Sequence, residues 1–171
     1  YYSTDDGANF SSTDGTLTYT GRGFLEAHAV ELSSGDVAIL GRSDQGYLIR
    51  VDFDTTTKTL GAVSTMPMRS PSAGACAVNL EDGTIAVAWV AGVPNAAQSS
   101  YPRKVVTVAF SDDDLATFEC QHVVITSGAL SDSMTTDAPY VHQPRVCVDG
   151  SGLVIYTERV VDGTTVATYK S

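Results

Sequence analysis

Apolar and polar residues alternate along most of the chain, with the period of two that is typical of half-buried β-strands. Clusters of Gly, Asp, Ser and Pro interrupt the alternation about every 8 to 12 residues, as turns do in antiparallel sheets. No stretch shows the 3.6-residue period of an amphipathic helix. The pattern therefore predicts an all-β protein made of short antiparallel strands.

Three tracts share one pattern of strand, tight turn and strand. They are HAVELSSGDVAILGR (28–42), ACAVNLEDGTIAVAW (75–89) and PRVCVDGSGLVIYTE (144–158), with turns at Gly35, Gly83 and Gly150. A third strand follows each tract: GYLIRVDF, KVVTVAF and TTVATYKS. The first two units also have a fourth strand, LGAVSTM and FECQHVVIT. A repeat of about 50 to 60 residues with four antiparallel strands is typical of a β-propeller blade.

A short acidic motif occurs twice, as STDDGANF (3–10) and SDDDLATF (111–118), 108 residues apart. The second copy lies between a third and a fourth strand. The last unit stops after its third strand, and ATYKSYYSTDDGANF, formed by joining the two ends on paper, aligns with KVVTVAFSDDDLATF without a gap. We therefore divide the chain into the end of a blade (1–23), a blade (24–72), a second blade (73–138) and an incomplete blade (139–171).

Three blades cannot close a ring, because propellers use about four to eight. We expect a second copy, in a homo-oligomer, or a missing half of the protein to complete about six blades. In a homodimer, residues 1–10 of one copy would complete the cut blade of the other and cover its strand edge.

Composition narrows the possible partners. An apolar content of 43% with 18% charged residues favours an ordered core, and the net charge of −10 opposes binding to nucleic acid or to anionic membranes. No apolar run approaches the roughly 18 residues of a membrane span. Residue 1 is not Met and no leader is visible, which suggests a processed chain or an excised piece.

The three cysteines, at positions 76, 120 and 147, form no metal-binding spacing. We expect buried free thiols, because Cys76 and Cys147 lie in apolar strands. The three histidines are too scattered for a metal triad, and we expect them to be solvated at strand edges. Trp89 and Tyr156, each at the end of a second strand, are expected to pack between blades rather than to form a sugar platform. We expect no metal and no cofactor.

The repeated motif resembles the Asp box of sialidases and related propellers. In that turn, Ser and Asp side chains bond backbone amides and an aromatic residue packs between strands. The matching residues are Ser3, Asp5, Gly7 and Phe10 in the first copy and Ser111, Asp113 and Phe118 in the second, where Leu115 replaces Gly. The resemblance implies a structural role. Calcium binding by residues 112–114 is the alternative, although the EF-hand spacing is absent.

The order of further residues also resembles the sialidase family. FLEAHAVELSSGDVAILGR matches a stretch with a catalytic Glu and a later Arg, here Glu26 and Arg42; YPRKVVTVAFSDDD matches another Arg, here Arg103. APYVHQPRVCVDGSGLVIYTE matches the segment with a nucleophilic Tyr, here Tyr140, although Arg145 and His142 lie nearby. The resemblance implies an exo-glycosidase that acts on terminal sialic acids, in which Glu26 activates Tyr140 and the two arginines bind the substrate carboxylate. A neutral Tyr avoids the repulsion that a carboxylate nucleophile would meet there.

Part of the family's machinery has no match: its first Arg, in an Arg-Ile-Pro motif, and its acid/base Asp. Two other functions therefore stay open, a non-catalytic glycan-binding or adhesion propeller, secreted or on a cell or virus surface, and a structural self-assembling module. Each site residue also has a simpler explanation. Glu26 would be a loop carboxylate, Arg42 would pair with Asp44, Arg103 would be exposed, and Tyr140 would cap a strand.

Overall fold

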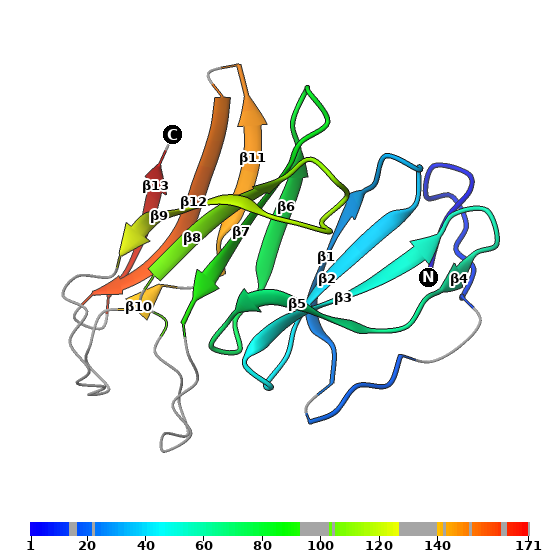
Figure 1. Ribbon diagram of the computed structural model, residues 1–171, viewed down its shortest axis with the longest axis horizontal. Coiled ribbons are helices and arrows are strands. Elements are labelled where there is room, and N and C mark those ends of the chain that lie inside the picture. The colour runs from blue at the N-terminus through cyan, green and yellow to red at the C-terminus, as the bar shows by residue number, and fades with distance from the viewer. Residues whose placement is uncertain are drawn as a thin grey trace.

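The computed structural model describes residues 1–13, 17–21, 23–92, 103, 105–126, 140–141, 143–150, 152–161 and 164–170. For residues 120, 125–126, 140 and those from 158 onward, the description covers the backbone. The described residues form three antiparallel sheets and no helix, which confirms the all-β prediction (Figure 1).

The strands are grouped into three separate sheets. The first contains β1 (Leu25–Glu31), β2 (Val37–Arg42), β3 (Tyr47–Asp54), β4 (Thr59–Leu60) and β5 (Ser64–Arg69). The second contains β6 (Ala75–Asn79), β7 (Ile85–Ala91), β8 (Val105–Ser111) and β9 (Glu119–Thr126) in chain order. The third contains β10 (Tyr140–Val141), β11 (Arg145–Asp149), β12 (Gly152–Val161) and β13 (Thr164–Lys170). The strand–turn–strand tracts form β1–β2, β6–β7 and β11–β12, as predicted.

The fourth strand of the first sheet is interrupted. The sequence LGAVSTM was expected to form one strand, but it is divided between β4 and β5, and both pair with β3. The Gly61 N–H donates to the Asp52 carbonyl at 2.8 Å, which ends the short β4 before β5 begins. A local apolar pattern does not reveal this break, because it depends on pairing across the sheet.

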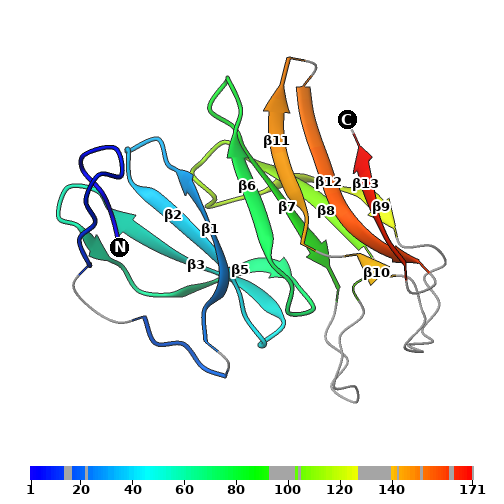
Figure 2. The same cartoon turned by 180° about the vertical axis from the view of Figure 1, so that it is seen from behind.

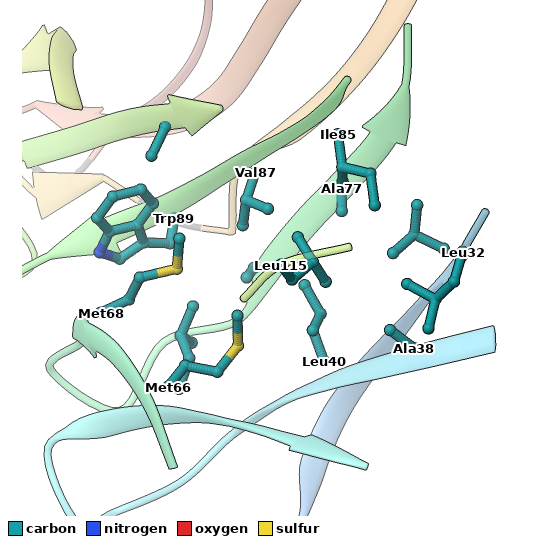
Figure 3. Packing of buried hydrophobic residues seen from close by; sticks show 14 residues of the cluster. Leu32, Ala38, Leu40, Met66, Met68, Ala77, Ile85, Val87, Trp89 and Leu115 are labelled. Carbon is teal, nitrogen blue, oxygen red and sulfur yellow. The ribbon is translucent and has the colours of Figure 1, made fainter. Parts of the chain in front are cut away.

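The core lies between the sheets. One buried cluster joins the first and second sheets and includes Leu40, Met68 and Trp89, whose indole N–H donates to the Arg69 carbonyl at 3.1 Å (Figure 3). A second cluster joins the second and third sheets and includes Val90, Val106 and Ile155. The sheets therefore stack face to face in chain order, as both views show (Figures 1 and 2). The predicted packing of Trp89 between blades is confirmed.

Three side chains differ from the predictions. Cys76 is a buried free thiol, but Cys147 is exposed, because it points away from the core that its neighbour Val146 joins. Tyr156 is 46% exposed and does not pack between the described sheets. His28 is half-buried rather than solvated: its Nε2 lies 2.8 Å from the Ala77 carbonyl and 3.6 Å from the Cys76 sulfur.

Candidate functional site

Glu26 lies at an irregular point of β1. The pairing of β1 with β2 shifts register between Leu25 and His28, and Glu26 within this bulge has a φ of 49°. A left-handed conformation costs a non-glycine residue of order 1–3 kcal/mol, so the surrounding contacts must hold it. The bulge directs the carboxylate toward the end of β2 instead of along the strand face.

Arg42, the last residue of β2, is the principal contact of Glu26. Its Nη1 forms an ion pair with Glu26 Oε1, and its Nε donates to the Ser72 hydroxyl at 3.1 Å. The Arg42 side chain is only 12% exposed and that of Glu26 is 33% exposed. Arg42 is therefore fixed in a partly desolvated position, and its ion-pair partner is Glu26 rather than the alternative, Asp44.

Arg103, two residues before β8, reaches the same place. Its Nη2 donates to the Ser72 carbonyl at 2.9 Å, so one residue receives hydrogen bonds from both arginines. Its own carbonyl accepts the Val141 N–H at 2.8 Å, which ties Arg103 to β10. Tyr140 is the other residue of β10, so its backbone lies next to this cluster, while its side chain is outside the described residues.

Ser72 organises the two arginines, and the sequence interpretation missed it. It is 7% exposed and has a φ of 54°, in the segment that connects the first and second sheets. The only local signal is its place in the turn-forming run SPSAG, which identifies a connection but not a site.

The charge state of Glu26 follows from its neighbours. Partial burial raises the pKa of its carboxyl, whereas the contacts with Arg42 and Gln143 and the charge of Arg103 lower it, and the lowering prevails. Glu26 is therefore ionised at neutral pH.

A pocket of about 170 Å³ opens beside the Glu26 carboxylate. Its walls are Glu26, Ala27, Gly74, Ala75, Gln143 and Arg145, which come from β1, β6 and β11 and the residues just before the last two. These are the first long strands of three sheets, and β6 contacts both of the others. Gly74 allows the close approach, since a Cβ there would lie 3.3 Å from Glu26 Oε2. The volume is below the roughly 300–1,000 Å³ of a typical small-molecule site.

The two acidic turns have the same hydrogen bonds. In the first, the Ser3 hydroxyl accepts the Gly7 N–H and Asp5 accepts the Asn9 N–H, both at 2.9 Å. In the second, the Ser111 hydroxyl accepts the Leu115 N–H at 2.9 Å and Asp113 accepts the Thr117 N–H at 2.8 Å.

Leu115 keeps the left-handed conformation of the glycine it replaces, with a φ of 69° against 85° at Gly7. The aromatic residues differ: Phe118 packs against the core, and Phe10 is 67% exposed. Within the described ranges, no group of three or more His, Cys, Asp or Glu side chains is placed to hold a metal ion. That part of the chain also contains no helix long and apolar enough to cross a lipid bilayer.

No protein-family profile and no curated protein sequence matches the chain. Solved structures do. The intramolecular trans-sialidase from Ruminococcus gnavus superposes on 99% of the chain with a TM-score of 0.67 and 17% identity. The chain has the fold of a sialidase-like β-propeller segment. The α-L-arabinanase of Penicillium chrysogenum covers 86% of it with a TM-score of 0.62 and 16% identity, and the NanB sialidase of Streptococcus pneumoniae covers 92% with a TM-score of 0.61 and 15% identity.

The chain spans less than half of each of these proteins: 36%, 46% and 23% of their lengths in the order given. At such low identity the likeness concerns the fold.

The structure thus brings together Glu26, Arg42 and Arg103 and places the backbone of Tyr140 beside them. Their catalytic and binding roles stay predictions. Ser72, Gly74 and Gln143 were not foreseen, because no motif connects them and they meet only where the sheets join. Arg145, which the sequence interpretation considered as a rival to Tyr140, lines the pocket; His142, the other rival, is outside the described residues.

Proposed function

We propose that this chain is part of a propeller glycoside hydrolase that acts on the terminal sialic acids of glycans. The observation that carries the proposal is the meeting of an ionised glutamate with two partly buried arginines beside a pocket between β1, β6 and β11. A sialic acid bears a carboxylate on its anomeric carbon, and planar guanidinium groups bind carboxylates in a bidentate manner. The fold of the similar structures supports the same class of enzyme.

In this proposal, Arg42 and Arg103 bind the substrate carboxylate. Tyr140 attacks the anomeric carbon while Glu26 accepts the phenol proton; the glycosidic bond breaks in the same step, and the departing oxygen takes a proton from a general acid. Ser72 positions both guanidinium groups from one point. The general acid comes from residues other than those matched here. A secreted or surface location of the protein goes with this role.

A second function is favoured by one contact, the ion pair between Glu26 and Arg42. An adjacent guanidinium stabilises the carboxylate and so makes it a weaker base. A propeller that binds sialylated glycans without turnover would need the arginines and the pocket but not a strong base.

Hydrolysis of an aryl sialoside tests the catalytic proposal. A phenolic leaving group departs with little protonation, so the missing general acid should matter less than for a natural linkage. We expect slow release of the phenol by the chain, loss of most of that activity in Tyr140→Phe, and no effect of Tyr19→Phe, a control whose hydroxyl contacts Thr65 of β5.

Equal turnover by wild type and Tyr140→Phe would contradict the nucleophile assignment. Binding of a sialylated trisaccharide with no turnover of the aryl sialoside would favour the glycan-binding function. Absence of both turnover and binding would contradict both functions.

A further inference from the structure

The second acidic turn is docked on the sheet that precedes its own. The Asp114 carboxylate accepts the Ser33 N–H at 2.8 Å and the Ser33 hydroxyl at 2.5 Å, and the Asp114 carbonyl accepts Arg50 Nη1 at 2.6 Å. Next to these bonds, Leu115 is buried in the cluster between the first and second sheets. This turn therefore holds the first and second sheets together.

The N-terminal turn has the same geometry but lacks such a neighbour. Asp6 and Gly7 have φ values of 53° and 85°, and their equivalents 108 positions later, Asp114 and Leu115, have 57° and 69°. The Tyr2–Ser11 bridge corresponds to the Phe110–Glu119 pair of the second sheet.

The N-terminal turn also has the same orientation. Phe110 packs toward the third sheet, the next sheet along the chain. Its equivalent Tyr2 likewise packs toward the first sheet, the next one along the chain from the N-terminal turn, with 5.7 Å between its ring and that of Phe53. The turn lies beside the first sheet, away from the second (Figures 1 and 2). Its opposite side, with Asp6 and Phe10, therefore faces away from the molecule. Phe10 is 67% exposed, and Asp6 makes no hydrogen bond with the described part of the chain.

A second copy of this chain offers the wrong partner for that side. The register of β6 with β7 matches that of β1 with β2 after a shift of 48 positions, since His28 pairs with Leu40 and Cys76 with Ala88. The turns match as well, because the Leu32 N–H bonds to the Asp36 carbonyl and the Leu80 N–H bonds to the Thr84 carbonyl, both at 2.8 Å.

This correspondence places Glu81 at the position of Ser33. It also places Val108 at the position of Arg50, because Leu40 pairs with Arg50 and Ala88 pairs with Val108. If the N-terminal turn completed the third sheet of a second copy, Asp6 would face Glu81. The hydroxyl and guanidinium donors would be absent, and two carboxylates would be brought together.

We propose that the surface formed by Asp6, Gly7 and Phe10 binds a propeller blade that differs from the second sheet of this chain at the positions of Glu81 and Val108. That blade presents a hydroxyl and an N–H in the turn between its two inner strands, and an arginine on its third strand. The ring is thus completed by a different polypeptide segment, not by strand exchange between identical copies. This interface is independent of the proposed catalytic role.

Sedimentation equilibrium of the full chain tests the proposal, with Glu81→Ser as the probe, because this substitution gives the second sheet the donors of Ser33. Glu81 is exposed in a turn, so the variant should fold. We expect wild type to be monomeric and Glu81→Ser to dimerise at least about 100-fold more tightly, since hydrogen bonds to a charged group contribute about tenfold at each of two interfaces.

Two controls isolate the contact. Asp82→Ser removes the same charge from the adjacent position. That position corresponds to Ser34, which does not bond to Asp114, so we expect no tighter dimerisation in this variant. Adding Asp6→Asn to Glu81→Ser should remove the gain. A wild-type dimer that is lost when residues 1–10 are deleted, or a Glu81→Ser chain that associates no better than wild type, would overturn the proposal.

Discussion

At the residue scale, the second acidic turn shows how a sequence can fix a charge. The Thr117 hydroxyl and N–H and the Ser111 hydroxyl all donate to Asp113, and these bonds lower the pKa of its carboxyl to about 2. The residues that bond are two and four positions away, so this feature is local. It could be foreseen from the motif alone, unlike the contacts of Glu26, which join three sheets.

The Asp113 carboxylate should make stability depend on pH. Its pKa is about 2 in the folded state and about 3.9 in an unfolded chain. Its stabilising effect is therefore complete above pH 4 and is lost as the pH falls toward 2. In urea unfolding, the difference in free energy of unfolding between wild type and Asp113→Asn should shrink between pH 5 and pH 2.

Asp112→Asn is the matched control, because Asp112 carries the same charge but accepts none of these hydrogen bonds. Its difference from wild type should change less over this range. A difference between wild type and Asp113→Asn that stays constant with pH would show that the bonds do not hold the carboxylate.

At the scale of elements, the strands were predictable because half-buried strands need alternating side chains. The break between β4 and β5 was not, since it depends on the Gly61 N–H reaching Asp52 across the sheet. The exposure of Cys147 and Tyr156 was also missed, because periodicity shows which face a residue shares but not whether another sheet covers that face. Ser72 and Gln143 belong to connections that have no period, so their role at the site emerges only in three dimensions.

The turn between β8 and β9 gives a prediction at this scale. Leu115 is 5% exposed and has a left-handed backbone. Truncation to Ala loses the buried side chain and keeps the strain, whereas truncation to Gly loses the side chain and relieves the strain, which is about 1–2 kcal/mol. Leu115→Gly should therefore be more stable than Leu115→Ala by about 1 kcal/mol in urea unfolding.

Ala109→Gly is the control for this comparison. Ala109 is fully buried in β8, where glycine should be less stable than alanine by about 0.5–1 kcal/mol. If Leu115→Ala were as stable as Leu115→Gly or more so, the left-handed turn would not be a source of strain.

At the scale of the whole molecule, three sheets of a propeller bring distant residues to one place. Glu26, Arg42 and Arg103 converge near β1 and β6, two strands of different sheets that contact each other. An isolated blade would not form this cluster. The proposed function requires that these residues recognise an anionic sugar.

The most direct measurement is an NMR titration of the ¹⁵N-labelled chain with sialyllactose, with lactose as the neutral control. We predict that sialyllactose, but not lactose, shifts the Arg42 Nε–H signal and the backbone amides of Ala27, Gly74 and Ala75, and that Arg42→Gln removes these shifts. Equal shifts with lactose, shifts confined to residues away from the pocket, or no shifts at all would contradict the proposed recognition of an anionic sugar.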